Sequence, residues 1–168
     1  YTEVDTLSLH DALPISKDVG IEIYTLSKTY NMAGWRVGFA AGNKSVIAAI
    51  NLLQDHMYVS LFGAVQEAAA EALLGPQECV VELNDLYESR STVLIDGLKN
   101  IGWHGTAPKG SFFAWLKVPE HFTSVEFADF LLEKAHIAVA PGVGFGEHGE
   151  GFVRVGLLSS EDRLKEAV

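Results

Sequence analysis

The sequence predicts an α/β fold in which the end of a large domain is joined by a long helix to a small α+β domain. Two strand-like segments, 20–26 and 37–42, precede the helix and are too few to close a sheet on their own. Apolar residues then keep a helical period over 77–100. After this helix, short strand patterns alternate with glycine-rich turns. We therefore expect a fragment with two parts, 17–100 and 101–168.

The elements of the first part follow from periodicity and from local start and stop signals. Apolar and polar residues alternate in the strand segments, whereas apolar residues recur at helical spacing elsewhere. Asn43 is a suitable N-cap for one helix, and Gly75 with Pro76 ends another. We expect, in order, a strand at 20–26, a largely buried strand at 37–42, and helices at 44–57, 63–74 and 77–100.

The second part begins beyond Gly102 and has shorter elements. The turn Pro108–Gly110 predicts a hairpin with one strand on each side. Thr123 or Ser124 is placed to cap a helix that contains 125–132. The remaining expected elements are a strand from Ile137 followed by a glycine-rich loop, a strand at 152–158, and a last helix opened by 159–161 that the chain cuts off at Val168.

The composition excludes several functional classes. With 12 basic and 22 acidic residues and a net charge of −10, the chain offers no basic surface to nucleic acid or to an anionic membrane. No apolar run reaches the roughly 18 residues that span a bilayer. Cys79 is the only cysteine, so we expect no internal disulfide, a reducing cytoplasmic location, and burial of its thiol. The histidines are scattered without ligand spacing, so we expect no metal site.

The first sixteen residues, YTEVDTLSLHDALPIS, do not continue naturally into the sequence that follows. They lack the basic start and the long apolar run of a signal peptide. The stretch LSLHDALPIS resembles a translated sequencing adapter. We expect 1–16 to be a non-native leader and assign no role to His10 or Asp11.

Two cations stand in one glycine-punctuated stretch of this acidic chain, TLSKTYNMAGWRVG. The guanidinium fork of Arg36 and the hydroxyls of Thr25 and Ser27 are suitable donors for a phosphate. Lys28, beside such an anion site, is a candidate nucleophile toward a carbonyl. Gly34 is expected to let the chain turn back without a Cβ clash. Taken singly, each cation is more often a solvated surface charge, so the combination carries the interpretation.

The segment TLSKTYNMAGWRVGFAAGN resembles the cofactor-lysine segment of the class I/II aminotransferases, fold-type I enzymes that depend on pyridoxal 5′-phosphate (PLP). The family pattern is Ser/Thr-x-Ser-Lys, an arginine eight residues after the lysine, and then x-Gly. It matches here at Thr25, Ser27, Lys28, Gly34, Arg36 and Gly38. The resemblance implies that Lys28 forms a Schiff base with PLP. It further implies that Thr25 and Arg36 bind the phosphate of PLP, with Ser27 a weaker candidate for the same role.

A second match lies at APGVGFGEHGEGFVRVGLL, which resembles the end-of-chain block of the same family. In that block, a glycine-rich turn precedes a strand with one arginine, and this arginine holds the α-carboxylate of the substrate. Arg154 stands in this position, and strand alternation would place it opposite its apolar neighbours. Without the Lys28 segment, an arginine on an edge strand in a surface ion pair is an equally good interpretation.

The order and separation of the two blocks fit the C-terminal part of the family fold over 17–168. The resemblance implies that 17–100 ends the large cofactor-binding domain, bridging helix included, and that 101–168 is the small C-terminal domain, clipped at its last helix. It also implies that the N-terminal half is absent, and with it the aspartate that pairs with the pyridine nitrogen. We expect this fragment alone to be inactive and the full-length parent to be a homodimer.

The implied reaction moves an amino group from an amino acid to a 2-oxo acid. No arginine occurs over 37–89, where dicarboxylate-specific members have a second one, so we expect a neutral side chain, as in the alanine- and methionine-type branch. The same residues occur in β-lyases and cyclopropane-forming synthases of this fold. Two further alternatives are a non-catalytic aminotransferase-like domain of a transcription regulator and a fragment that is only an interaction module.

Overall fold

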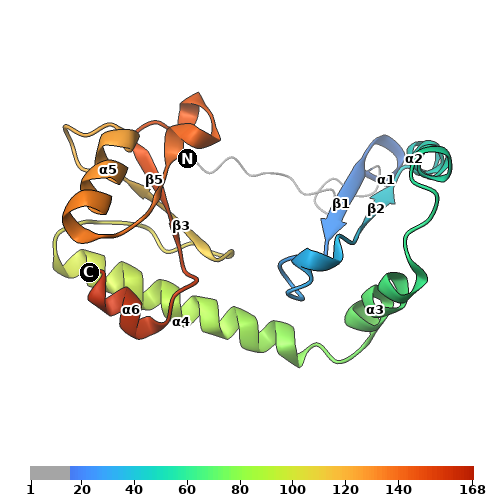
Figure 1. The fold of residues 1–168 in the computed structure, drawn as a ribbon, viewed down its shortest axis with the longest axis horizontal. Coiled ribbons are helices and arrows are strands. Elements are labelled where there is room, and N and C mark those ends of the chain that lie inside the picture. The colour runs from blue at the N-terminus through green and yellow to red at the C-terminus, as the bar shows by residue number, and fades with distance from the viewer. Residues whose placement is uncertain (1–15) are drawn as a thin grey trace. The chain divides into compact units, whose positions relative to one another are not determined.

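The computed structural model describes residues 16–168 (Figure 1), and the chain divides between Val80 and Val81 into two compact units. The expected leader over 1–16 lies outside the described residues except for Ser16, which begins the first helix. Within 16–168, no helix is both long and apolar enough to cross a membrane.

The first unit is built on an antiparallel hairpin that is followed by two helices. In its register, Thr25 is opposite Gly38 in the last strand pair before the connection between β1 and β2. The side chain of Asn43 accepts hydrogen bonds from the backbone of Ser45 and Val46, which confirms it as an N-cap. The elements are, in order, α1 (Ser16–Val19), β1 (Ile21–Thr25), the 3₁₀ helix η1 (Ala33–Trp35), β2 (Gly38–Gly42), α2 (Lys44–Met57) and α3 (Gly63–Leu74).

The core of the first unit is small and lies beneath the β1–β2 connection. Its fully buried residues are Leu26, Met32, Val37 and Ala69. The expectation that 37–42 is a largely buried strand is wrong, because four of the five residues of β2 are exposed. Among the described residues, β2 pairs only with β1.

The second unit places a three-stranded antiparallel sheet against helices. The strand order is β3-β5-β4, so β5 is the central strand. Thr123 begins α5 with a capping box that includes Glu126, and Ser160 caps α6. The elements are, in order, α4 (Glu78–Asn100), β3 (Phe113–Lys117), α5 (Ser124–Ala135), β4 (Ala140–Pro141), the 3₁₀ helices η2 (Gly142–Phe145) and η3 (Glu147–Gly149), β5 (Phe152–Gly156) and α6 (Glu161–Glu166).

The expected strand before Pro108 is not formed, and this prediction is wrong. The segment before β3 packs on the core of the second unit and does not pair with β3. A Cβ added to Gly105 would lie 2.6 Å from the Leu116 side chain, and the indole nitrogen of Trp103 donates to the backbone oxygen of Lys117 over 2.8 Å. β3 therefore takes its hydrogen-bonding partner from β5, far along the chain.

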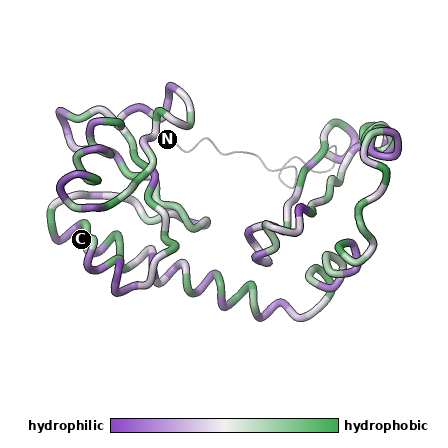
Figure 2. Tube along the Cα trace, viewed as in Figure 1, coloured by the Kyte–Doolittle hydropathy of each residue, from purple (hydrophilic) through white to green (hydrophobic). Residues whose placement is uncertain are grey.

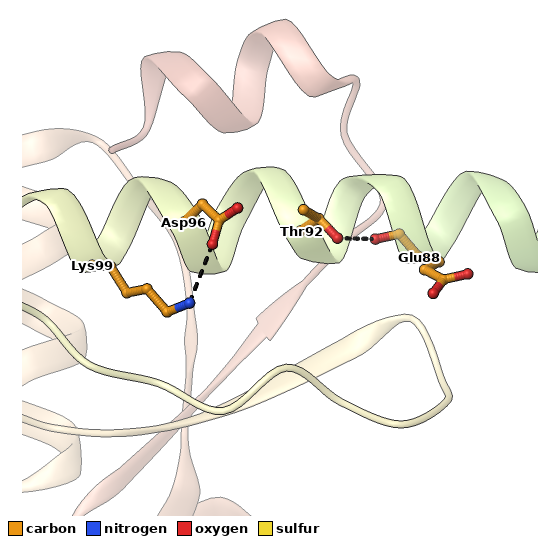
Figure 3. Close-up of polar contacts among 4 residues, drawn as sticks. All are labelled: Glu88, Thr92, Asp96 and Lys99. Carbon is orange, nitrogen blue, oxygen red and sulfur yellow. Dashed lines mark hydrogen bonds and ion pairs between the residues drawn. The ribbon is translucent and has the colours of Figure 1, made fainter.

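Helix α4 packs with the second unit through one apolar face, and Figure 2 shows apolar and polar bands alternating along it. Leu94, Ile95 and Leu98 are buried in one cluster with Leu116 and Val153. This packing accounts for the inclusion of most of α4 in the second compact unit, which begins at Val81. The opposite face is exposed and carries the polar contacts in Figure 3 among Glu88, Thr92, Asp96 and Lys99. In the first turn, Cys79 is exposed, contrary to the expected burial.

Candidate functional site

The predicted cofactor residues lie at the end of the β1–β2 hairpin, where Thr25 is in the last strand pair and the others are in the connection that follows. Leu26 and Val37 are buried, and the Leu26 amide donates to the Val37 carbonyl over 3.3 Å, so the two arms stay paired there. Residues alternate sides along such extended arms. Thr25 and Arg36 are accordingly exposed and Ser27 is half-buried, on the positions next to the buried anchors.

The hydroxyls of Thr25 and Ser27 are in direct contact. Thr25 Oγ1 donates to Ser27 Oγ over 2.9 Å and accepts from the Ser27 amide over 3.2 Å. Both bonds are local, between residues two apart, as is usual for hydroxyl side chains in turns. Lys28 follows at once as an exposed residue in the first turn after β1. The hairpin end therefore carries two bonded hydroxyls and, on the next residue of the chain, an amine.

Arg36 has an unusual backbone conformation. Its φ of 52° and ψ of 45° place it in the left-handed region, where it ends η1. Few residues other than glycine adopt this region, and such outliers concentrate at functional sites. Its Nη1 donates to the backbone oxygen of Ala33 over 3.1 Å. The role expected for Gly34 is wrong, because a Cβ there would meet nothing within 4 Å and the left-handed turn falls on Arg36 instead.

The donors at this hairpin end suit a phosphorylated aldehyde such as PLP. A guanidinium and two hydroxyls supply hydrogen bonds to phosphate oxygens, and a neighbouring primary amine can condense with an aldehyde. The buried residues Leu26 and Val37 hold the backbone from which these groups project. The residues present therefore fit the implied cofactor.

Arg154 lies in the second unit on the central strand β5, directly opposite Trp115 of β3 and Ala140 of β4. The alternative of an edge-strand arginine is therefore wrong. Its guanidinium carbon lies 4.1 Å from the ring centroid of Phe113 and 4.1 Å from that of Phe145. Within residues 16–168, no carboxylate is within ion-pair distance of Arg154.

The face of the sheet around Arg154 is aromatic. Phe113, Trp115 and Phe152 share it by strand alternation and register, and Trp115 stacks on Phe152 with ring centroids 5.8 Å apart. Phe113 and Trp115 are half-buried there and are not part of the buried core. The core is on the other face, where Ala114 and Leu116 are buried. The alternation of large and small residues in FFAWL could have indicated this.

The loop between β4 and β5 is anchored by a pair that sequence analysis missed. Glu150 accepts from the Ser124 amide over 2.7 Å, from the Ser124 hydroxyl over 2.9 Å and from the Gly151 amide over 2.9 Å. The Ser124 amide has the largest effect, and with the other two donors it lowers the pKa of the Glu150 carboxyl below its ordinary value. Ser124 is fully buried at the start of α5. The two residues are 26 positions apart, so no local pattern indicates the contact.

Other polar groupings offer no competing site. No cluster of three or more potential metal ligands occurs in the part of the chain that the structure describes. A hollow of about 490 Å³ is lined by residues of α1, the end of β2 and the start of α2, namely Lys17, Asp18, Gly42, Asn43, Lys44, Ser45 and Ala48. None of the predicted site residues lines it.

Comparison with known proteins gives a family and similar relatives. The family described as "Aminotransferase class I and II" matches residues 6–168. The L-glutamine–4-(methylsulfanyl)-2-oxobutanoate aminotransferase of Bacillus subtilis is 72% identical over 152 residues, which cover 90% of this chain and 38% of that protein.

Solved structures are similar over the same extent. The substrate-bound structure of BacF from Bacillus subtilis has a TM-score of 0.86 and 44% identity, over 90% of this chain and 39% of that one. The aromatic aminotransferase from Pyrococcus horikoshii has a TM-score of 0.87 and 31% identity, over 94% and 43%. The chain thus spans about two fifths of the length of these relatives. These shares do not identify the matched end, so the placement in the C-terminal part of the fold stays a prediction.

Proposed function

The chain belongs to the class I and II aminotransferase family, and from this premise we propose that it is part of a PLP-dependent enzyme that transfers an amino group from an amino acid to a 2-oxo acid. The hairpin end carries this proposal, because it holds Lys28 directly beside the bonded hydroxyls of Thr25 and Ser27. The names of the relatives, all aminotransferases or transaminases, support transfer over the lyase, synthase and regulator alternatives.

Each predicted residue has a distinct task in this proposal. PLP, when bound, supplies a carbonyl for the amino group and a ring that withdraws electrons from the neighbouring Cα–H bond. Lys28 would hold the cofactor covalently until the substrate amine displaces it, and the freed lysine amine would then take the proton from the substrate Cα. Thr25, Ser27 and Arg36 bind the phosphate, and Arg154 binds the α-carboxylate through its planar fork.

We propose a donor or acceptor with a neutral side chain. A second carboxylate would need another cation, and no arginine occurs over 37–89. The name of the Bacillus subtilis relative pairs glutamine with a sulfur-containing 2-oxo acid, and both have uncharged side chains. This agreement supports the neutral class without selecting one amino acid.

The domain assignment and the assembly are part of the same proposal. Residues 17–100 belong to the large cofactor-binding domain with its bridging helix, 101–168 to the small domain, and the full-length protein is a cytoplasmic homodimer. The chain spans only about two fifths of the length of its relatives. This share supports the inference that the remaining contacts to the cofactor come from outside the 168 residues. We therefore expect the 168-residue chain alone to be inactive.

The test is an absorbance spectrum of the full-length protein with added PLP, before and after borohydride reduction. We expect a visible band of lysine-bound PLP that reduction converts to a stable adduct on the peptide containing Lys28. Lys28→Ala should lose the band and the adduct, whereas Lys44→Ala, which removes a lysine at the start of α2 in the same unit, should keep both. A band that survives in Lys28→Ala would refute the assignment.

Product analysis then separates transfer from elimination. Transfer yields a 2-oxo acid from the donor and a new amino acid from the acceptor, in equal amounts. Pyruvate with free ammonia from a β-substituted amino acid would instead indicate a lyase. A protein that binds PLP and turns over neither class would support the non-catalytic alternative.

A further inference from the structure

The guanidinium of Arg154 lies over two aromatic rings. Phe113 and Phe145 each lie 4.1 Å from its carbon, measured to the ring centroid. A guanidinium stacks favourably on aromatic faces, and its N–H donors all lie in its own plane. With aromatic rings packed against the guanidinium, its N–H edge is the part that offers hydrogen bonds to a ligand.

The two rings come from different elements. Phe113 belongs to β3, whose neighbours Ala114 and Leu116 are buried, so its position is fixed by the sheet. Phe145 ends η2 in the glycine-rich loop and remains 50% exposed. Burial alone therefore does not account for the position of Phe145, whereas its contacts with Arg154 and Trp115 do.

The loop that carries Phe145 is held on both sides of this residue. Before it, the Val143 amide donates to the buried Ser124 hydroxyl over 3.4 Å. After it, Glu150 binds Ser124 and the Gly151 amide. Gly142 and Gly149 also approach so closely that a Cβ on Gly142 would lie 2.1 Å from the Gly149 carbonyl oxygen. The loop thus presents Phe145 in one defined place.

We propose that Phe145, together with Phe113, is a positioning residue that holds the Arg154 guanidinium in place, so that its N–H edge is ready to meet a substrate carboxylate. This inference rests on the proposed function, in which Arg154 binds the α-carboxylate. Preorganising the fork reduces the freedom that Arg154 loses on binding and favours a planar, two-point carboxylate over other anions. Phe145 itself needs no contact with the substrate for this role.

The test measures binding of a carboxylate and of its uncharged analogue to the full-length PLP-loaded protein. The probes are 4-methylpentanoate and 4-methylpentanamide, each titrated by ligand-observed NMR. Phe145→Leu should raise the Kd of the carboxylate about fivefold, the size expected for one stacking contact with a cation, and leave the Kd of the amide unchanged. Phe145→Tyr, which keeps the ring, should restore carboxylate binding to within about twofold of the unmodified protein.

Phe152→Leu is the matched control, because Phe152 lies on the same sheet face and stacks on Trp115. It should leave both Kd values unchanged, and equal weakening by Phe145→Leu and Phe152→Leu would overturn the proposal in favour of general aromatic packing. Phe113→Leu repeats the comparison if circular dichroism shows that Phe145→Leu does not fold.

Arg154→Lys distinguishes the carboxylate-binding role of Arg154 from the positioning role of Phe145. If it weakens carboxylate binding by tenfold or more, on the order expected for loss of the planar fork, while Phe145→Leu and Phe113→Leu have no effect, the positioning role is refuted and the proposed function stands. If Arg154→Lys leaves carboxylate binding unchanged, the proposed role of Arg154 fails, and this inference fails with it.

Discussion

Gly38 lies so close to Tyr24 across the β1–β2 hairpin that a Cβ at position 38 would be 2.4 Å from the Tyr24 carbonyl oxygen. The contact is with backbone, which cannot rotate away as a side chain can. Gly38 is also paired directly with Thr25, one of the predicted cofactor residues. The identity of residue 38 therefore determines whether the two arms can approach at this site.

Gly38→Ala should destabilise the hairpin and weaken PLP binding. The added methyl has to push the two strands apart, which costs about 1–3 kcal/mol by analogy with overpacked cores, and separation of the strands displaces Thr25. Thermal unfolding and a PLP titration of the full-length protein measure both effects. Gly34→Ala is the control, because a Cβ there meets nothing within 4 Å. Equal effects of the two substitutions would contradict the argument.

Much of the fold follows from local signals in the sequence. The helices predicted at 44–57 and 63–74 are confirmed with the same bounds, because Asn43 caps one and Gly75 with Pro76 ends the other. The strand predicted before Pro108 failed because packing of Gly105 on Leu116 overrides the local turn signal. Local chemistry thus fixed the helices, whereas long-range contacts decided strand pairing.

The candidate site shows the same difference between features that local sequence indicates and features that depend on long-range contacts. The residue types and spacing of Thr25, Ser27, Lys28 and Arg36 indicated the hairpin end, and the roles of these residues stay predictions. The ring of Phe145 over Arg154 and the bond between Ser124 and Glu150 were not predicted. Both join residues that are far apart in the chain or on different elements, and a single sequence has no period or motif that records such contacts.

Arg36→Gln should reduce the preference for PLP over pyridoxal. The guanidinium is the only cationic phosphate donor in the proposal, and one charge-assisted hydrogen bond contributes about 1.5–3 kcal/mol, or roughly 10- to 100-fold in affinity. The measurement is best made in a Lys28→Ala background, where binding is non-covalent. Because pyridoxal lacks the phosphate, its affinity should change little.

The control for this substitution is Arg163→Gln, which removes an exposed arginine paired with Glu166 on α6. It changes the net charge equally and should leave the ratio of PLP to pyridoxal affinity unaltered. If Arg36→Gln weakens both ligands to the same extent, Arg36 supports the fold and does not contact the phosphate.

Glu150 should make the loop between β4 and β5 sensitive to acid. In the folded protein, hydrogen bonds from the Ser124 amide, the Gly151 amide and the Ser124 hydroxyl lower the pKa of the Glu150 carboxyl. The pKa of the same group in the unfolded chain is about 4.3. A lowered folded pKa means that the stabilisation is fully present above about pH 4.3 and is lost as pH falls through the folded pKa. Glu150→Gln should therefore lower stability at neutral pH and flatten its dependence on acid.

Unfolding midpoints of the two proteins between about pH 3 and pH 7 measure this difference, with the range set by the unfolded carboxyl pKa. Glu147→Gln is the control in the same loop, since Glu147 is exposed and faces only His148 at 3.7 Å. Glu126 also has a lowered pKa, from the Thr123 amide and hydroxyl, so part of the acid sensitivity should persist in Glu150→Gln. A pH profile identical to that of the unmodified protein would contradict the role assigned to Glu150.

Gly105 and Leu116 should show strong energetic coupling. Leu116 is 1% exposed, and its Cδ2 lies 2.6 Å from the position of a Cβ on Gly105. Leu116→Ala should cost about 2–5 kcal/mol through the cavity it leaves, and Gly105→Ala should cost about 1–3 kcal/mol through overpacking. In the double variant the new methyl enters the space that the leucine vacated, so the combined cost should be smaller than the sum of the two.

Chemical denaturation of the full-length protein gives the four free energies of this cycle. Leu132→Ala combined with Gly105→Ala is the comparison pair, because Leu132 on α5 is 52% exposed and its loss should simply add to that of Gly105→Ala. Additive costs for Gly105 and Leu116 would mean that the segment before β3 does not pack on the sheet as described. Coupling above about 0.5 kcal/mol would establish that this packing, and not a β-hairpin, is what the sequence from Trp103 to Pro108 specifies.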